Sequence, residues 1–148
     1  MLWEKAGSRG LEPPTGKADL GLMKPDHITI LVRSLAKSMP FYDALLPLLG
    51  YEKQKNHIWH DGDGFFIQFA QAKTATSDYE RYAPGMNHLG FGAPDAAFVR
   101  MVRDAMMAAG FAVPDIQDLG GATALFMKDP DGMRFEITFY PPGMPVVE

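Results

Sequence analysis

Two histidines, a glutamine and a glutamate occupy matching places in the two halves of this chain. His27 and His88 each open a stretch of alternating apolar residues, and each is followed 22 or 23 positions later by a glycine. Gln68 and Glu136 each stand four positions after the glycine that closes an Asp/Gly-rich turn. Because side chains alternate across a sheet, all four project from the face that their apolar neighbours do not use. Two histidines, one carboxylate and a further oxygen donor are typical of a site for a first-row divalent metal ion.

The other two histidines form a rival cluster. His57 and His60 flank two apolar residues and are followed by Asp61 and Asp63. Residues three apart on a strand point to opposite faces, so the two rings are poorly placed to share an ion. The following Asp-Gly-Asp-Gly segment is explained as a hairpin turn. The pattern therefore favours hairpin residues over a second metal site.

The elements that position these residues follow from apolar spacing. In the first half, residues 26–32 alternate as a strand, and apolar residues at helical spacing end at Gly50. Pro40 fits best in the first turn of that helix, which predicts a regular start at about Ser38. Strands are predicted near 51–52 and, on either side of the Asp-Gly turn, at 58–59 and 65–69.

The second half repeats this order. Residues 86–91 are predicted to form a strand, and Asp95 is predicted to cap a helix that ends at Gly110. Two strands follow at 124–127 and 133–139, joined by an Asp-Pro-Asp-Gly turn. A repeat of about 60 residues in two copies is too long and too few for a solenoid, so the chain is predicted to be two similar α+β modules.

Composition limits the chemistry. The chain has 148 residues, a formal charge of −4 and no cysteine, which excludes thiolate metal sites and disulfides. We expect one domain over 23–148 after a flexible leader at 1–22, with modules at about 26–72 and 86–140. No basic cluster indicates nucleic acid, and no apolar run is long enough to span a membrane. The expected location is the cytoplasm.

Three segments resemble a known group of proteins. They are the two openings HITILVRSLAKSMPFYDALLPLLGYE and MNHLGFGAPDAAFVRMVRDAMMAAGF and the close ALFMKDPDGMRFEITFY. Together they resemble the vicinal oxygen chelate superfamily, which includes glyoxalase I, extradiol dioxygenases, fosfomycin-resistance thiol transferases and bleomycin-binding proteins. The resemblance covers residues 26–140, and its most specific part is D-P-D-G-x-x-x-E, which ends at Glu136.

The resemblance implies a fold and a site. The expected fold is α+β, with two βαβββ modules that form a curved mixed sheet around a divalent metal ion, which the sequence does not identify as Zn, Ni, Mn or Fe. The implied metal ligands are His27, His88 and Glu136, with Gln68 as a fourth ligand or substrate contact. Glu136 is also the candidate catalytic base. In many relatives of this size the site is completed in a homodimer, and we expect the same here.

The resemblance leaves several activities open. We expect a glyoxalase-like lyase or isomerase that acts on a small metabolite through two neighbouring oxygens. Leu31 and Ala72 replace an arginine and an asparagine of glutathione-dependent members, which argues against glutathione. One alternative is a ring-cleaving dioxygenase, although residues 125–127 lack the tyrosine expected there. The other is a metal-free binding or antibiotic-resistance protein, although such proteins usually lose the ligands that this chain retains.

Overall fold

The computed structural model describes residues 23–145, so the leader predicted at 1–22 lies outside the described residues. The described chain consists of two βαβββ modules in sequence. The first contains β1 (His27–Val32), α1 (Leu35–Leu48), β2 (Glu52–Lys53), β3 (Ile58–His60) and β4 (Phe66–Gln71). The second contains β5 (His88–Gly92), α2 (Ala96–Ala108), β6 (Gln117–Leu119), β7 (Ala122–Lys128) and β8 (Arg134–Phe139). The repeat predicted from the sequence is thus a structural repeat.

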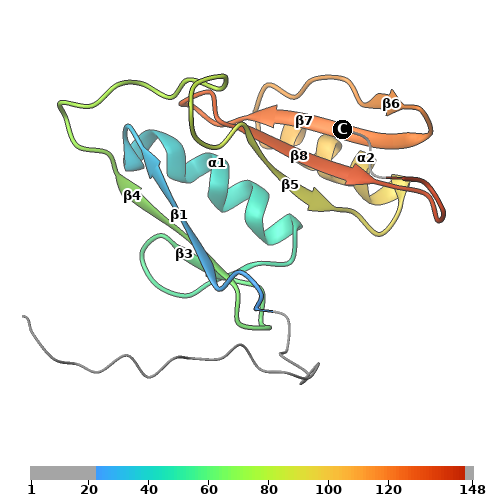
Figure 1. Ribbon diagram of the computed structural model, residues 1–148, viewed down its shortest axis with the longest axis horizontal. Helices are drawn as coiled ribbons and strands as arrows, with labels where there is room; N and C mark the ends of the chain where they lie inside the picture. Colours follow the sequence, from blue (N-terminus) through green and yellow to red (C-terminus); the bar gives the residue numbers. More distant parts are fainter. Residues whose placement is uncertain (1–22, 146–148) are drawn as a thin grey trace, which may run out of the picture.

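Each module builds its own four-stranded mixed sheet. The strand orders are β1-β4-β3-β2 and β5-β8-β7-β6, so the same topology occurs twice. In each sheet the first and last strands of the module pair in parallel, and the remaining pairs are antiparallel. Within the described residues no strand pair joins the two sheets, which lie next to each other in Figure 1. The predicted α+β fold is confirmed, in the form of two adjacent sheets.

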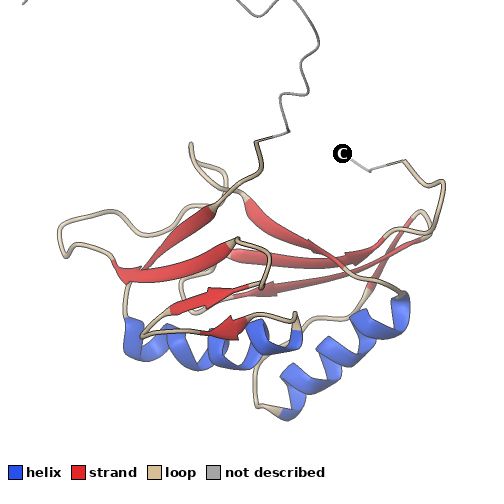
Figure 2. Ribbon diagram, turned by 90° about the horizontal axis from the view of Figure 1, so that it is seen from below, coloured by secondary structure: helices blue, strands red, loops and turns tan. Residues whose placement is uncertain are grey.

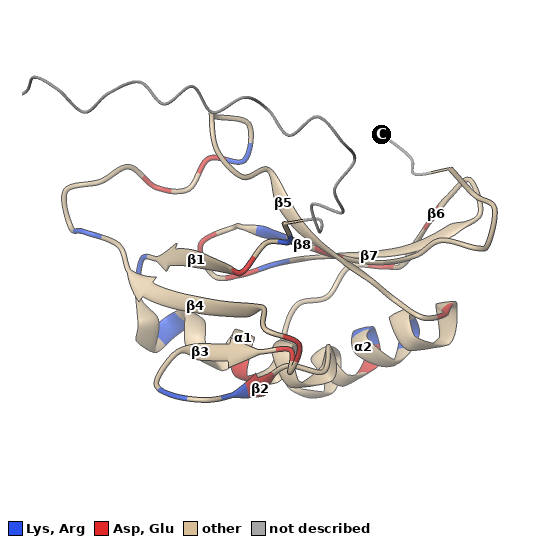
Figure 3. Cartoon of the chain, turned by 60° about the horizontal axis from the view of Figure 1, so that its bottom comes forward, with Lys and Arg blue, Asp and Glu red and all other residues tan. Residues whose placement is uncertain are grey.

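Both helices cover the same side of the molecule. Figure 2 shows α1 and α2 below the strands, with no helix on the opposite face of either sheet. The buried side chains of the two modules form one continuous core, to which Tyr42 of α1 and Phe135 of β8 contribute rings with centroids 5.5 Å apart. The faces that carry the candidate site residues therefore point away from this core. Acidic and basic residues are intermixed along the helices, loops and strand ends (Figure 3).

Helix α1 begins earlier than the proline indicated. Its N-cap is Ser34, whose side chain accepts a hydrogen bond from the backbone N–H of Lys37, and the helix runs from Leu35. Pro40 thus lies inside the helix and not in its first turn, so the start predicted near Ser38 is wrong by one turn. The cap sets the start because it satisfies a backbone donor that would otherwise be unpaired. The cap predicted at Asp95 is confirmed, with its Oδ1 2.7 Å from the backbone N of Phe98.

The two Asp-Gly turns use the same hydrogen bonds. Asp61 Oδ1 accepts hydrogen bonds from the backbone N–H groups of Asp63 and Phe65. Asp129 Oδ1 accepts the equivalent pair, from Asp131 and Met133. The turn predictions are therefore confirmed in both modules.

One strand gave no signal in the sequence. Strand β6 has three residues, of which Gln117 and Asp118 are exposed, so it shows neither apolar alternation nor β-branched side chains. Strand β5 runs over His88–Gly92 instead of the predicted 86–91. Neither α1 nor α2 has the length and apolar character that crossing a membrane requires, and the described residues contain no other helix.

Candidate metal centre

The four candidate site residues all lie on the sheet faces that the helices leave uncovered. In β4, Ile67 and Phe69 are buried in the core, and Gln68 between them is only half-buried. In β8, Phe135 and Ile137 are buried, and the side chain of Glu136 between them is 13% exposed. His27 and His88 are exposed at the first positions of β1 and β5. The alternation predicted from the sequence is confirmed at all four positions.

His88 and Glu136 form the most compact part of the site. Strands β5 and β8 are parallel neighbours, with Gly90 directly opposite Glu136. His88 lies two residues earlier on the same face, and its Nε2 is 3.2 Å from Glu136 Oε2. Two ligand atoms that each bind one ion at about 2.1 Å lie about 3.0–3.4 Å apart at right or tetrahedral angles. The separation of this pair therefore fits two ligands of a single ion.

The hydrogen bond at Nδ1 of His88 indicates that Nε2 is the ring nitrogen available to a metal ion. The Nδ2 amide of Asn87 donates to the carbonyl of Arg81 (3.1 Å), which turns Asn87 Oδ1 toward His88 Nδ1 (2.8 Å). Because Oδ1 is an acceptor, Nδ1 carries a proton, and Nε2 is the nitrogen whose lone pair a metal ion could use. That lone pair faces a carboxylate oxygen of Glu136, and two acceptors at this distance are stabilised by a proton or a cation between them.

Glu136 is oriented in the same way. Its Oε1 accepts a hydrogen bond from the hydroxyl of Thr138 (2.6 Å), two residues further along β8. The other oxygen, Oε2, is the one that faces His88. Thr138 thus fixes the carboxylate so that one oxygen is satisfied and the other is directed to the candidate centre.

The first module repeats this arrangement with other partners. His27 Nδ1 is 2.7 Å from Asp26 Oδ2, and the ring stacks on Phe66 with centroids 4.8 Å apart. An ionised carboxylate only accepts hydrogen bonds, so Nδ1 is the donor and Nε2 is left free. Gln68 Nε2 donates to the hydroxyl of Thr29 (2.7 Å). The amide nitrogen is thus engaged, and the amide oxygen is the atom that could bind a metal ion.

A single chain does not bring its two pairs of candidate ligands together. His27 and Gln68 lie in the first sheet, whereas His88 and Glu136 lie in the second, and no hydrogen-bonded strands connect the sheets. Over residues 23–145, no group of three or more His, Asp or Glu side chains is placed to hold one metal ion. A single chain therefore presents two separate pairs of candidate ligands, each with its own hydrogen-bonded neighbours.

In the rival cluster near the first hairpin, His60 and Asp61 make local hydrogen bonds. His60 Nδ1 accepts a hydrogen bond from the backbone N–H of Gly62 (3.2 Å), and its Nε2 lies 2.7 Å from the side-chain amide nitrogen of Gln54. Asp61 Oδ1 accepts two backbone hydrogen bonds of the turn. These contacts support the interpretation of His60 as a hairpin residue, whereas Nδ1 of His57 is buried and has no hydrogen-bond partner among the described residues.

A pocket of about 610 Å³ adjoins the His88–Glu136 pair. Its lining comes from strands β5 to β8 and the segments before β5 and after β8, and it comprises Arg81, His88, Gly90, Phe91, Gly92, Leu119, Phe126, Arg134, Glu136, Thr138 and Tyr140. Burial lowers the pKa of the Arg134 guanidinium, and the positive charge of Arg81 acts in the same direction. With two guanidiniums and one carboxylate in its lining, the pocket is cationic next to the candidate ligands.

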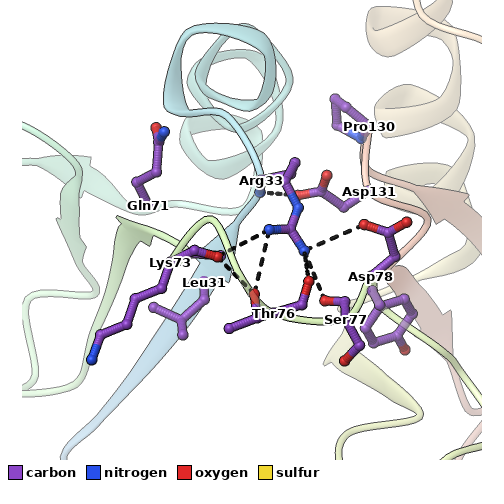
Figure 4. A pocket seen from close by; sticks show the side chains of 11 residues that line it. Leu31, Arg33, Gln71, Lys73, Thr76, Ser77, Asp78, Pro130 and Asp131 are labelled. Carbon is purple, nitrogen blue, oxygen red and sulfur yellow. Dashed lines mark hydrogen bonds and ion pairs between the residues drawn. The ribbon is translucent and has the colours of Figure 1, made fainter.

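A larger pocket, of about 720 Å³, lies elsewhere, between β1 and the loop after β4. It contains Leu31 and Ala72, the two positions that depart from glutathione-dependent relatives. The guanidinium of Arg33 crosses it and donates to the carbonyls of Ser77 (2.7 Å) and Thr76 (3.2 Å) (Figure 4). This arginine fixes the loop, so its hydrogen-bonding capacity is already used within the chain.

Sequence reasoning did not identify the supporting residues. Asp26 and Asn87 each directly precede a candidate histidine, and that shared position was the available signal. Arg81 and Arg134 carried no signal, because neither lies in a spacing that predicts a pocket. These residues became visible only once strand register and loop conformation were known.

Comparison of the sequence with known families gives one match over most of the chain. The profile of the Glyoxalase/Bleomycin resistance protein/Dioxygenase superfamily matches residues 24–137. The uncharacterized protein YqjT of Bacillus subtilis is 30% identical over 123 residues, which cover 75% of this chain and 94% of YqjT.

Solved structures show the same architecture. A candidate glyoxalase from Bacillus halodurans aligns with a TM-score of 0.67 at 25% identity, covering 78% of this chain and 95% of the other. A glyoxalase/bleomycin resistance protein/dioxygenase domain from Frankia aligns with a TM-score of 0.68 at 18% identity, covering 82% and 100%. The fosfomycin resistance protein FosX of Listeria monocytogenes aligns at 0.61 and 17% identity, covering 82% and 97%. At these last two identities the likeness concerns the fold alone.

Proposed function

The chain belongs to the Glyoxalase/Bleomycin resistance protein/Dioxygenase superfamily, and from that membership we propose that it is a divalent-metal-dependent enzyme that catalyses a lyase or isomerase step on a small oxygenated metabolite. One observation carries the proposal. At each of the four candidate positions a neighbour engages the atom that would not bind metal. The proposed ligand atoms of His88 and Glu136 face each other, and those of His27 and Gln68 have no hydrogen-bond partner among the described residues. Such support of ligands by neighbouring hydrogen bonds is typical of metal sites.

The proposed ligand atoms are Nε2 of His27, Nε2 of His88 and Oε2 of Glu136, with the amide oxygen of Gln68 as a fourth ligand or a substrate contact. Imidazole nitrogens and oxygens suit Zn, Ni, Mn and Fe, so the donor set leaves the metal identity open among these. A bound ion would supply Lewis-acid stabilisation of negative charge on two neighbouring substrate oxygens.

Glu136 is the proposed general base. Of the two oxygen-bearing residues, Gln68 has an amide that cannot accept a proton at neutral pH, whereas Glu136 has a carboxylate. Thr138 holds Oε1 and leaves Oε2 directed toward His88 and the pocket. In the proposed reaction, Glu136 would leave the ion, and this oxygen would accept a proton from the carbon next to a carbonyl group and return it to the neighbouring carbon.

We place the complete site in a homodimer. His27 and Gln68 lie in one sheet of the chain and His88 and Glu136 in the other, so each chain offers two incomplete sets. The sheet faces that carry them have no helix over them within residues 23–145. A second copy whose first sheet faces the second sheet of the first copy would complete two equivalent sites by two-fold symmetry.

The proposed substrate is not a glutathione adduct. Leu31 and Ala72 lack the polar groups that glutathione-dependent relatives carry at these positions, and the nearby Arg33 is engaged by the loop at 73–78. The ring-cleaving alternative is also less well supported, because Leu125 and Met127 are buried in the core and Phe126 packs beneath the guanidinium of Arg134.

Metal analysis tests the proposal. Protein purified without chelators is expected to contain about one equivalent of divalent metal per chain, and His88→Ala is expected to lose it. His57→Ala is the matched control, since it removes a ring from the hairpin cluster and should keep the metal. Less than about a tenth of an equivalent, unchanged by added Ni, Zn, Mn or Fe, would favour the metal-free binding protein. Metal loss in His57→Ala alone would move the site to the hairpin.

Two activity assays separate the enzymatic alternatives. Oxygen uptake with catechols after loading with Fe(II) would support the ring-cleaving dioxygenase. Turnover of a glutathione hemithioacetal would support a true glyoxalase and contradict the prediction drawn from Leu31 and Ala72. We expect neither in the metal-loaded protein.

A further inference from the structure

Two arginines converge on the pocket beside His88 and Glu136. Arg134 lies on β8 directly opposite His88 and two residues before Glu136, on the same face of the sheet. Arg81 reaches the pocket from the loop before β5. Glu136 is the only acidic residue that lines this pocket, so the lining is cationic overall.

The guanidinium of Arg134 is held in place by an aromatic ring. Its central carbon lies 3.8 Å from the ring centroid of Phe126, which is in register with Glu136 on the neighbouring strand β7. A guanidinium stacked flat on a ring keeps its N–H groups at its edge available for hydrogen bonds. The stacking therefore fixes the orientation of Arg134 without consuming its donors.

Arg81 is also fixed without being neutralised. Its carbonyl accepts the hydrogen bond from Asn87, and its guanidinium lies 4.9 Å from the ring centroid of Tyr82. Its Nε is buried and has no hydrogen-bond partner among the described residues. A buried donor without an acceptor is costly unless a ligand supplies one.

Arg81 and Arg134 differ in this respect from two other arginines of the described chain. Arg33 lies 3.3 Å from the carboxylate of Asp78, and Arg103 lies 3.0 Å from that of Asp115. Between residues 23 and 145, no carboxylate lies within ion-pair distance of Arg81 or Arg134. Two partly buried cations close to each other repel, and an anion between them removes that repulsion.

The floor of the pocket leaves room for such an anion. Gly90 and Gly92 lie opposite Glu136 and Thr138 in the sheet. A Cβ atom at either glycine would meet nothing within 4 Å, and neither glycine has a positive φ that would require this residue type. Within the described residues, the space beside these two glycines is therefore open, and the backbone conformation does not require glycine at either position.

We propose that Arg81 and Arg134 bind an oxyanion group of the substrate, either a carboxylate or a phosphate, next to His88 and Glu136. The inference deepens the proposed function and rests on it for the reaction, because it places the anionic end of the metabolite beside the reacting centre. Binding of the anion itself requires only the two guanidiniums, which match the geometry of carboxylate and phosphate oxygens.

The test measures anion binding to metal-free protein by calorimetry at constant ionic strength. Malonate and inorganic phosphate are the two anionic probes, and malonamide is the uncharged counterpart of malonate. We expect one of the anions to bind and malonamide not to bind. Arg134→Gln and Arg81→Gln should each weaken anion binding at least about tenfold. Arg134→Lys should recover part of the loss, because it restores the charge without the planar fork.

Arg100→Gln is the matched control, because it removes the same charge from the exposed surface of α2 and should leave anion affinity unchanged. Equal affinity for malonate and malonamide, or equal affinity in wild type and both pocket variants, would overturn the proposal. So would conversion of a dimer to monomers by Arg81→Gln or Arg134→Gln, since the arginines would then pair with a second copy. Metal content measured on the same variants keeps this result separate from the proposed function.

Discussion

At the residue scale, a histidine ring offers only one nitrogen to a metal ion, and in both modules the preceding residue engages the other one. Asp26 accepts from His27 Nδ1, and Asn87 accepts from His88 Nδ1. The two supports differ in charge, since a carboxylate raises the basicity of the ring more than an amide does. The chain thus holds two histidines in the same tautomer by two different means.

Asn87 should act as a positioning residue for His88. We expect Asn87→Ala to weaken metal affinity by about 10–100-fold, because the ring loses the partner that fixes its tautomer and orientation. Asn87→Asp should restore most of the affinity, since its carboxylate accepts from Nδ1 as Asp26 does in the first module. The measurement is competitive titration with a chelator of known affinity.

A purely structural role for Asn87 would give a different pattern. Its amide also donates to the carbonyl of Arg81, and aspartate cannot make that bond. If the loop contact were what matters, Asn87→Asp would lose as much metal affinity as Asn87→Ala. Melting temperatures of both variants show whether either substitution disturbs the fold.

The candidate residues could be predicted from the sequence, but their supports could not. A period-two pattern with one polar residue among buried neighbours is visible in the sequence around Gln68 and Glu136. The hydrogen bond from Thr138 to Glu136 depends on rotamers, and the approach of Arg81 depends on the path of a loop. Neither follows from residue spacing.

At the element scale, the turn between β7 and β8 connects the two modules. Asp129 is buried, and its Oδ2 accepts a hydrogen bond from the hydroxyl of Tyr42 on α1 at 2.5 Å. Asp131 accepts a hydrogen bond from the backbone N–H of Arg33, just after β1 (2.7 Å). The sequence identified these aspartates as turn residues, and their second role follows from the packing of the modules.

Burial of Asp129 should leave a signature in the dependence of stability on pH. Burial raises the pKa of this carboxyl above its ordinary value, although the hydrogen bond from Tyr42 acts in the opposite direction. A carboxyl with a raised folded pKa contributes stability that is fully present below its unfolded pKa, about 4, and is lost as pH rises through the folded pKa. Asparagine does not ionise, so Asp129→Asn should not show this loss of stability.

We therefore expect the stability of Asp129→Asn to rise relative to wild type between about pH 4 and neutrality. The slope of the difference reaches at most about 1.4 kcal/mol per pH unit, which is the value for one proton. Urea unfolding across this range measures it. Asp61→Asn is the matched control, because Asp61 makes the same two turn hydrogen bonds at the exposed surface. A parallel rise in both variants would assign the effect to the turn and not to burial.

The helices show how far local signals extend. The cap at Asp95 and the glycines that end both helices could be predicted, because capping and positive φ are local requirements. The start of α1 was wrong because Pro40 was given more weight than Ser34. Strand β6 was missed because pairing with β7, rather than its own side chains, makes it a strand.

At the scale of the whole molecule, the repeat explains why the candidate ligands of a single chain form two separate pairs. Each module contributes one histidine and one candidate oxygen donor, and the two modules share one core, in which α1 of the first module packs against β8 of the second. The sheet faces that lie away from this core carry the four candidate ligands. A dimer that pairs unlike modules would bring together one set from each chain.

A mixing experiment can determine whether the site is shared between chains. His27→Ala and His88→Ala are expected to lose metal as homodimers, because every site then lacks one ligand. A heterodimer of the two, isolated with two different affinity tags, would contain one site without either mutation and one with both. If the site is shared, we expect about half of the wild-type metal content per chain in this heterodimer.

The pairing of variants makes the outcome specific to a shared site. If all ligands of a site came from one chain, each site of the heterodimer would still lack one histidine, and metal content would stay at the level of the parents. The control heterodimer combines His88→Ala with Glu136→Gln, which alter the same pair of candidate ligands. In a shared arrangement both of its sites are damaged, so it should recover nothing. Recovery of metal in the first heterodimer but not in the second would therefore require that one chain supplies His27 and its partner supplies His88 and Glu136. Recovery in both heterodimers would contradict the arrangement proposed for the two sheets.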